Sequence, residues 1–483
     1  MKTKQLWFGL AFLLNVPLHA QWATNNLNTP ASILYHTTVP GKAIFTNGTE
    51  WDLFDVNTNT HWFGNMAFAR TNILTATLGD KAYFAGGKYG YFADPLYTKV
   101  VDVYNNTTDS WTTMNLSLAR EVGGAGAINN KVVFAGGIGR DFGGPTMLYN
   151  KVDIFDNTTG ARTTGKLSKK KTNIACGAAA NKIVFAGGWY WDAMYNIKTS
   201  NSVDIYNTVS GTWSTALLSQ KRDNISVAII GNSIIFAGGT GGKYNNPVKN
   251  VDTYNASTNT WTSSLMPLAD YGMQSAVIGN KAYFTGGLGG NAQKMFIYDN
   301  VSNSWTTYLL PFDLSNFAFC AINDKLYFAG GFDNMISDLS DAVYVYDPAT
   351  NIWTTEYLSV ARKALHVVVS GNTAVFAGGI MAPAYPVTPS DVVDLYTAPM
   401  RNTDTDPVQI AFDLNIYPNP AGVVLVIQLN HSPEIEMPFT IFDTQGKYIM
   451  GGFITEEQTQ LYVGNLAPGN YFLRAKMIRE NNA

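Results

Sequence analysis

Cysteine is scarce in this sequence. The chain of 483 residues contains two, Cys176 and Cys320. A framework of several disulfides is therefore excluded, and stability must come from buried surface. We expect both cysteines to be buried, unpaired thiols.

Charged residues and long apolar runs are also few. Charged residues make up 14 % of the chain, and the formal net charge of −3 gives no basic field for nucleic acid. The longest apolar stretch, residues 6–14, is too short to span a bilayer. Lys2 and Lys4 precede it and Leu18-His19-Ala20 follows it, as in a signal peptide. We expect residues 1–20 to be this signal, and the mature protein to be soluble, without a transmembrane segment.

Catalytic motifs are missing as well. The sequence contains no G-x-S-x-G, H-E-x-x-H or P-loop motif. Between residues 21 and 397 the histidines are His36, His61 and His366. Two histidines without a placed carboxylate or thiolate are weak evidence for a metal site. We therefore expect no metal and no cofactor.

A repeat dominates the sequence. Phe-Ala-Gly-Gly or a variant of it recurs, and its phenylalanines are Phe45, Phe84, Phe134, Phe185, Phe236, Phe284, Phe328 and Phe376. An aromatic anchor stands 22 or 23 residues earlier, as Trp22, Trp62, Trp111, Trp213, Trp261, Trp305 and Trp353, with Arg162 in the fourth unit. A strand such as VDVY follows each phenylalanine. Regular short strands with glycine-rich turns indicate an all-β repeat protein.

The two ends of the repeat complete one unit. Tyr396 has no tryptophan after it, and Trp22 has no aromatic strand before it. A closed ring explains this split, because the N-terminal strand then seals the last sheet. We predict eight blades of four antiparallel strands, with seven as the alternative because the unit at 23–62 is the shortest.

The glycine pair with spaced tyrosine and tryptophan resembles the kelch repeat. The resemblance covers residues 21–397 and implies a kelch-type β-propeller. Small residues such as those at 123–128 suit the innermost strands, where the ring is tightest. Cys176 and Cys320 fall on such strands, too far apart around the ring to pair.

The last 70 residues follow a different pattern. A polar linker is expected at 398–411, and strands joined by turns at 412–483 predict a small β-sandwich. Tyr417-Pro418-Asn419-Pro420, the turn from Asp443 to Gly446 and the segment 466–471 resemble the type A C-terminal sorting domain of the type IX secretion system of Bacteroidota. The resemblance implies export through the outer membrane, secretion or surface attachment, and contact with that secretion machinery. An Ig-like accessory domain is the alternative.

Binding residues are expected on two features of one propeller face. The connection from the second to the third strand varies from 9 to 21 residues and is rich in aromatic residues, while the rest of the unit keeps its length. A basic residue stands 14 positions before the phenylalanine in five units, where the innermost strand opens. By the kelch resemblance, these basic residues could hold an anionic ligand at the channel mouth, or they could pair with aspartate and loop carbonyls. The candidate ligand-binding residues are Arg70, Arg120, Lys171, Arg222, Arg362, Arg140, Tyr91, Trp189, Tyr190, Trp191 and Tyr195.

Three functions remain open at this stage. The first is a secreted or surface-attached binding propeller, expected to be a monomer, that recognises a glycan or an extracellular protein. The second is a carbohydrate-active enzyme, namely a sugar oxidase, epimerase or lyase. The third is a structural or adhesion protein of the cell surface.

The sorting-domain resemblance makes a prediction about processing. Protein collected outside the cell should lack residues 412–483, because such domains are usually removed after export. Intact-mass spectrometry of the secreted form measures this directly. A secreted chain that still ends at Ala483 would contradict removal.

Overall fold

The computed structural model describes residues 6–10, 21–91, 94–140, 144–242, 246–382, 386–399, 414–418, 422–429, 437–443 and 448–475. The chain divides into two compact units, Ala20–Ala398 and Met1–His19 together with Pro399–Ala483. Regular structure in the described residues is entirely β, and no helix among them could cross a membrane. Residues 400–411 of the expected linker lie outside the described residues.

The larger unit consists of groups of four antiparallel strands, here numbered as blades; each forms a four-stranded sheet, except that the sheet of blade 5 includes two further short strands. Blade 1 comprises β3 (Tyr35–Val39), β4 (Lys42–Thr46), β5 (Glu50–Asp55) and β6 (Thr60–Asn65). Blade 2 comprises β7 (Leu74–Leu78), β8 (Lys81–Ala85), β11 (Val100–Asn105) and β12 (Ser110–Asn115). Blade 3 comprises β13 (Gly124–Ile128), β14 (Lys131–Ala135), β17 (Lys151–Asp156) and β18 (Arg162–Lys166). Blade 4 comprises β19 (Ala175–Ala179), β20 (Lys182–Ala186), β23 (Ser202–Asn207) and β24 (Trp213–Leu217).

The second half of this unit repeats the arrangement. Blade 5 comprises β26 (Ser226–Ile230), β27 (Ser233–Ala237), β29 (Asn246–Asn255) and β30 (Thr260–Asp270). Blade 6 comprises β31 (Gln274–Ile278), β32 (Lys281–Thr285), β33 (Lys294–Asp299) and β34 (Ser304–Leu309). Blade 7 comprises β36 (Ala318–Ile322), β37 (Lys325–Ala329), β40 (Ala342–Asp347) and β41 (Ile352–Tyr357). Blade 8 comprises β42 (His366–Ser370), β43 (Thr373–Ala377), β44 (Ser390–Thr397) and β2 (Gln21–Ala31).

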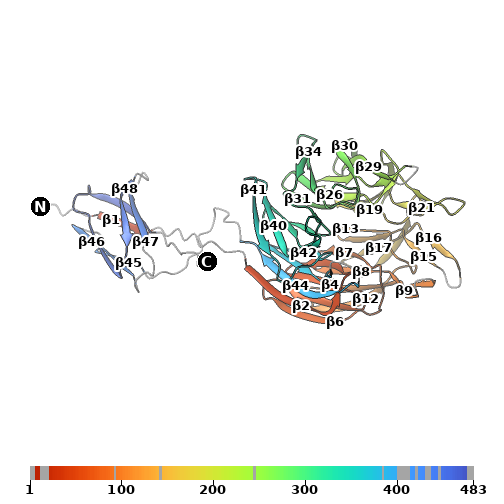
Figure 1. Ribbon diagram of the computed structural model, residues 1–483, viewed down its shortest axis with the longest axis horizontal. Helices are drawn as coiled ribbons and strands as arrows, with labels where there is room; N and C mark the ends of the chain where they lie inside the picture. The colour runs from red at the N-terminus through yellow and green to blue at the C-terminus, as the bar shows by residue number, and fades with distance from the viewer. Residues whose placement is uncertain are drawn as a thin grey trace. The chain divides into compact units, whose positions relative to one another are not determined.

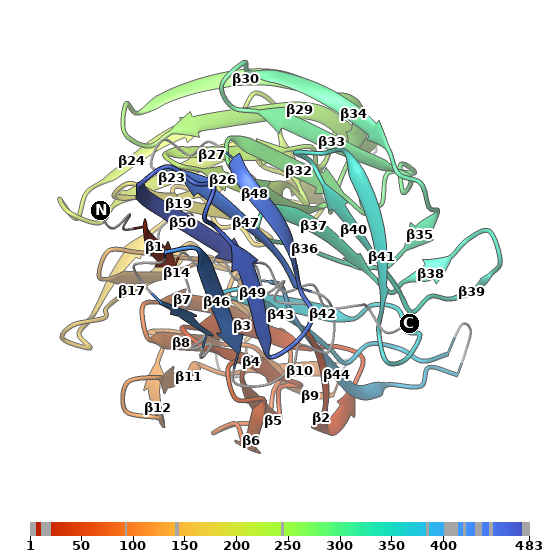
Figure 2. The ribbon, with the colours of Figure 1, turned by 90° about the vertical axis from the view of Figure 1, so that its left-hand side faces the viewer.

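The blades close into a ring. The innermost strands contact one another in order from β3 to β42, and β42 contacts β3 again. Figure 2 shows the N-terminal strand β2, in red, beside β44, in blue, and Trp22 stands opposite Tyr396 in their pairing. The all-β propeller expected from the sequence is therefore the fold, and the N-terminal strand completes the last blade.

Tight packing explains the small residues near the ring axis. A Cβ atom placed on Gly126 of β13 would lie 2.4 Å from the Cγ2 atom of Ile183 in blade 4. One on Gly177 of β19 would lie 2.4 Å from the Cγ2 atom of Ile234 in blade 5. Neighbouring blades thus approach so closely that any larger side chain would have to displace a branched aliphatic one.

The tryptophan anchors pack farther out, between blades. Trp353 stacks on Tyr346 of its own blade with ring centroids 4.7 Å apart, and its indole N–H donates to the hydroxyl of Tyr308 in blade 6. Trp22 packs against Tyr396 at 4.8 Å and donates to Glu356 of blade 7. Each of these rings fills space between two neighbouring blades.

The smaller unit is a two-sheet sandwich. One sheet contains β45 (Leu414–Tyr417), β46 (Val424–Leu429) and β49 (Gln458–Tyr462). The other contains β47 (Met437–Asp443), β48 (Tyr448–Ile454), β50 (Gly469–Ala475) and β1 (Leu6–Leu10), which runs parallel to β50. Their shared core includes Leu425, Ile427 and Ile441. Of the expected signal peptide, only β1 belongs to the described residues, and residues 444–447 of the expected turn lie outside them.

Replacing the ring-closing tryptophan should destabilise the propeller. Trp22→Ala removes the contact with Tyr396 and the hydrogen bond to Glu356. We expect a loss of about 2–3 kcal/mol, below the value for a fully buried tryptophan because Trp22 is half-buried. Urea unfolding measures the change, with Thr24→Ala, an exposed position on the same strand, as the control. Equal unfolding midpoints for the two variants would contradict the role of Trp22 in closure.

Candidate functional site

The connections between the second and third strands of the blades form one face of the ring. In blades 2, 3 and 4 they are hairpins, with β9 (Lys88–Tyr91) and β10 (Asp94–Tyr97), β15 (Ile138–Arg140) and β16 (Thr146–Leu148), and β21 (Trp189–Trp191) and β22 (Ile197–Thr199). Blade 5 adds β25 (Arg222–Asp223) with β28 (Thr240–Gly241), and blade 7 adds β35 (Leu314–Ser315), β38 (Phe332–Asp333) and β39 (Asp338–Leu339). Figure 1 shows β9, β15, β16 and β21 together at the right-hand end of the propeller. We call this the hairpin face.

The hairpin of blade 4 carries the densest aromatic group. The rings of Trp189 and Trp191 are 5.9 Å apart, and those of Trp191 and Tyr195 are 6.4 Å apart. Lys169 lies over the ring of Tyr190, 3.1 Å from its centroid, as a cation–π pair. The four aromatic residues expected at this site are therefore brought together on one short hairpin.

A polar turn shapes the tip of that hairpin. The carboxylate of Asp192 accepts hydrogen bonds from the backbone N–H groups of Met194 and Asn196, each at 2.9 Å. These bonds hold the pKa of Asp192 below its usual value. Tyr195 adopts a left-handed φ of 61° at this turn. The tip is thus built by local hydrogen bonds and projects apolar side chains.

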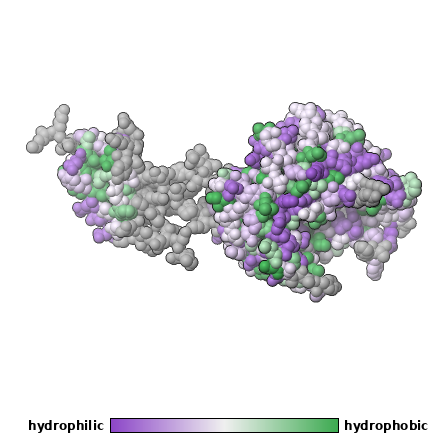
Figure 3. Space-filling view, turned by 45° about the horizontal axis from the view of Figure 1, so that its top comes forward, coloured by the Kyte–Doolittle hydropathy of each residue, from purple (hydrophilic) through white to green (hydrophobic). Residues whose placement is uncertain are grey.

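Exposed apolar side chains mark the tips of this face. Tyr91 is 85 % exposed, Met194 82 % and Tyr195 79 %. Other exposed apolar residues on the same set of connections are Leu96, Ile197, Leu288, Met335, Ile336 and Val387. Figure 3 shows that apolar side chains on the side in view are separate spots among polar ones. The exposed apolar residues of the hairpin face are distributed over the connections of blades 2, 4, 6, 7 and 8.

Arg140 connects two neighbouring hairpins. Its guanidinium pairs with the carboxylate of Asp94, which lies at the tip of the blade 2 hairpin. This pair holds the pKa of Asp94 below its usual value. The two residues that follow, Asp141 and Phe142, lie outside the described residues.

The five basic candidates are not at an open channel mouth. The structure buries all of them and pairs them with aspartate: Arg70 with Asp102, Arg120 with Asp153, Lys171 with Asp204, Arg222 with Asp252, and Arg362 with Asp394. Their side chains have no exposed surface to offer a ligand. The anion-binding role considered for them is set aside, and the alternative of pairing with aspartate and loop carbonyls describes their geometry.

Arg120 shows how these residues work. Its Nε atom donates to the carbonyl of Gly136 at 2.9 Å, and its Nη2 atom donates to the carboxylate of Asp153 at 2.8 Å and to the carbonyl of Phe134 at 3.3 Å. Burial lowers the pKa of the Arg120 guanidinium, and the charge of Asp153 opposes that shift. The side chain thus ties the start of blade 3 to the glycine turn of the same blade.

The glycine pair completes the link to the preceding blade. The N–H of Gly87 in blade 2 donates to the carbonyl of Arg120 at 3.0 Å. A Cβ atom on Gly86 would lie 2.3 Å from that carbonyl oxygen, and Gly86 has a left-handed φ of 63°. Only glycine fits this approach without strain. The Phe-Ala-Gly-Gly repeat is therefore the contact by which one blade binds the next.

The aspartate partners were missed as functional positions in the sequence. They are the aspartates of VDVY, VDIF, VDIY, VDTY and VDLY. The alternating pattern of a strand does not by itself distinguish these positions from any others. Asp153 also accepts a hydrogen bond from the backbone N–H of Ser117 in the segment that leaves blade 2, at 2.8 Å. A recurring acid in the middle of an otherwise apolar strand was the available signal.

The remaining titratable candidates are partly or fully buried. The rings of His36 and His366 meet across the closure at 5.3 Å, and the N–H of Leu34 donates to the Nε2 atom of His366. Burial, together with the charge of His366, lowers the pKa of His36 to about 4. In the part of the chain that the structure describes, no group of three or more metal-binding side chains is found. Cys176 and Cys320 are free thiols; Cys320 is buried, as expected, whereas Cys176 is only partly buried. Burial raises the pKa of Cys320 to about 12.

Comparisons with known proteins identify two segments. Residues 313–356 match the family model of the Kelch motif, and residues 415–482 match that of the secretion system C-terminal sorting domain. The chain carries a kelch motif and a sorting domain. The kelch match covers the four strands of blade 7, from β36 to β41, and the sorting-domain match covers the strands of the sandwich from β45 to β50.

The sorting domain indicates export by the type IX secretion system to the cell surface or the extracellular space. A solved structure titled "Structure of YjhT" is similar at 14 % identity and a TM-score of 0.37, over 58 % of this chain and 95 % of that one. No curated protein matches the sequence.

Removing one buried aspartate should strongly destabilise the kelch propeller. Asp153→Ala leaves the Arg120 guanidinium buried without its counter-charge, which typically costs about 3–5 kcal/mol. Asp94→Ala, which breaks the exposed pair with Arg140, is the control and should barely move the unfolding midpoint. Urea unfolding followed by tryptophan fluorescence compares them. A small, equal effect of both changes would show that the buried pair does not hold the blades.

Proposed function

We propose that the protein is an exported binding propeller whose hairpin face recognises a glycan or an extracellular protein. The observation that supports this most is the exposure of apolar side chains at the tips of connections from several blades. The propeller ring is fixed by buried pairs, so these tips vary without disturbing it. Export by the sorting domain places that face where extracellular ligands are found.

The aromatic hairpin of blade 4 supports a glycan ligand. Trp189, Trp191 and Tyr195 present ring faces beside the carboxylate of Asp192 and the amide of Asn196. Aromatic faces pack on the apolar C–H faces of sugars, while carboxylate and amide groups bind hydroxyls.

The aliphatic tips support a protein partner. Met194, Met335 and Ile336 are largely exposed, and neither methionine nor isoleucine offers a hydrogen bond to a sugar. Such side chains at separate loop tips resemble the anchors that dominate protein–protein contacts. The two ligand classes are therefore separated by experiment.

Binding assays with a hairpin variant test the proposal. The labelled full chain is applied to a glycan array and, in parallel, to an array of deglycosylated extracellular matrix proteins. The triple variant Trp189→Ala, Tyr190→Ala, Trp191→Ala should reduce binding by about tenfold or more, because aromatic anchors carry most of the energy of such surfaces. Leu217→Ala removes an exposed apolar side chain from β24 of the same blade, outside the hairpin face, and serves as the control.

The array that responds identifies the ligand class. A signal on either array that the triple variant loses and the control keeps supports the proposal. Binding that survives the triple variant would place recognition elsewhere, and no binding on either array would contradict a recognition role for this face.

A further inference from the structure

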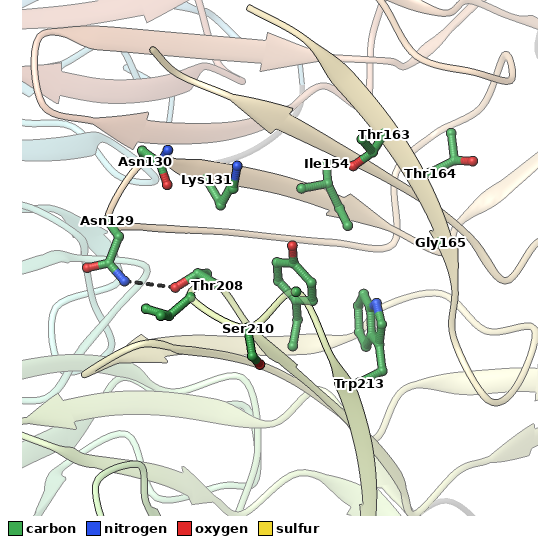
Figure 4. A pocket seen from close by; sticks show the side chains of 13 residues that line it. Asn129, Asn130, Lys131, Ile154, Thr163, Thr164, Gly165, Thr208, Ser210 and Trp213 are labelled. Carbon is green, nitrogen blue, oxygen red and sulfur yellow. Dashed lines mark hydrogen bonds between the residues drawn. The ribbon is translucent and has the colours of Figure 1, made fainter. Parts of the chain in front are cut away.

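A cleft of 730 Å³ lies between blades 3 and 4. Its apolar lining comes from Ile154, Tyr206 and Trp213, and its polar lining comes from Asn129, Asn130, Lys131, Thr163, Thr164, Thr208 and Ser210 (Figure 4). The turns that line it join the first to the second strand and the third to the fourth strand. In an antiparallel blade these turns lie at the end opposite the hairpins, so the cleft is distinct from the hairpin face.

The hydroxyl of Tyr206 lacks the partner that other blades supply. In four blades the equivalent tyrosine donates to a side chain five residues later: Tyr104 to Asp109, Tyr254 to Asn259, Tyr298 to Asn303 and Tyr346 to Asn351, at 2.5–2.9 Å. In blade 4 the fifth residue is Gly211, which has no side chain to accept the bond. Among the described residues, the Tyr206 hydroxyl has no hydrogen-bond partner.

The indole of Trp213 is uncovered for a similar reason. At three other junctions the anchor tryptophan donates to a side chain of the preceding blade: Trp305 to Ser264, Trp353 to Tyr308 and Trp22 to Glu356. The matching position before Trp213 is Gly165, and a Cβ atom there would lie 3.4 Å from the indole nitrogen. Within the described part of the chain, this N–H also has no hydrogen-bond partner. Because two positions are glycine, the Tyr206 hydroxyl and the Trp213 indole N–H are both left without a partner at the same junction.

The charge at the cleft is already balanced. The ammonium group of Lys131 lies 2.6 Å from the carboxylate of Asp156, and Asn130 donates to the same carboxylate at 3.1 Å. Asn129 donates to the hydroxyl of Thr208 at 2.8 Å, which Figure 4 draws as a dashed line, and this fixes the orientation of both groups. The cleft thus presents hydroxyl, amide and indole groups without net charge.

We propose that this cleft binds a neutral saccharide unit. The volume lies in the range of small-molecule sites, about 300–1,000 Å³. The aromatic rings would pack on the C–H face of a sugar, and the unpartnered Tyr206 hydroxyl and Trp213 N–H would bond its hydroxyls. The balanced Lys131–Asp156 pair gives no advantage to a charged sugar. The site stands independently of the ligand proposed for the hairpin face.

Two substitutions copied from neighbouring blades test this site. Gly165→Ser restores the hydroxyl that Ser264 supplies to Trp305, and Gly211→Asn restores the amide that Asn259 supplies to Tyr254. A Cβ atom on Gly211 meets nothing within 4 Å, and asparagine tolerates its φ of 70°, as Asn259 does at 58°. The double variant should fold normally, and its new side chains should form hydrogen bonds with the Tyr206 hydroxyl and the Trp213 N–H. Ala216→Ser, at the matching position before Trp261, is the control.

The measurement is saturation-transfer NMR on the full chain. The probes are glucose, galactose, mannose, N-acetylglucosamine and their disaccharides, with glucuronic acid as a charged comparison. At least one neutral probe should bind, and the double variant should weaken it by about tenfold, as expected for two lost hydrogen bonds. Tyr206→Phe, which removes only the hydroxyl, should weaken it without altering the fold, and Ala216→Ser should leave it unchanged.

Three results would overturn the inference. They are no transfer to any neutral probe, equal binding by the double variant, and stronger binding of glucuronic acid than of every neutral sugar. The hairpin triple variant should keep the cleft signal, so a failure of this site and a failure of the hairpin face give different patterns.

Discussion

The buried pair between a basic residue and an aspartate is the interaction on which the blade boundaries depend. At the boundary of blades 2 and 3, Arg120 bonds Asp153 and the carbonyl of Gly136 with its side chain, while its own carbonyl accepts the N–H of Gly87. Burying both charges is costly, and it is tolerated here because nearly every donor meets an oxygen. Since one residue contacts two blades, each boundary that carries such a pair is fixed by the same few atoms.

Blades without a basic residue solve the same problem differently. In blade 6 the position is Asp270, whose carbonyl still accepts the N–H of Gly239 and whose carboxylate accepts that of Gly289. In blade 7 it is Leu314, which packs with Phe312 and Phe317 in an apolar cluster. Polar networks and well-packed apolar groups of similar volume can replace each other at a buried site. The backbone approach is preserved while the side-chain chemistry changes.

This rigid ring separates stability from recognition. The polar side chains that hold the blades together bond one another inside the ring. The variable hairpins therefore contribute little to stability and can expose Tyr91, Met194 and Tyr195 to solvent. At the opposite end, between blades 3 and 4, the natural chain has glycine at two positions where other blades have a hydrogen-bonding side chain. The Tyr206 hydroxyl and the Trp213 N–H therefore lose their partners, while the strands keep their pairing. Both candidate sites thus arise from departures from the repeat on a scaffold that the repeat holds constant.

The repeat spacing by itself determined the propeller and its closure by the N-terminal strand, because glycine, tyrosine and tryptophan periodicity encodes local strand and turn geometry. The sorting domain was indicated separately, by the motifs at 417–420, 443–446 and 466–471. The sequence left open whether Arg120 and its equivalents hold an anionic ligand or pair with aspartate, and only the tertiary structure showed them buried against aspartates of the third strand. Sequence distance hides such contacts: Arg120 and Asp153 are 33 residues apart. Likewise, Gly165 and Gly211 are unremarkable as residues, and their effect on Trp213 and Tyr206 exists only where two blades meet.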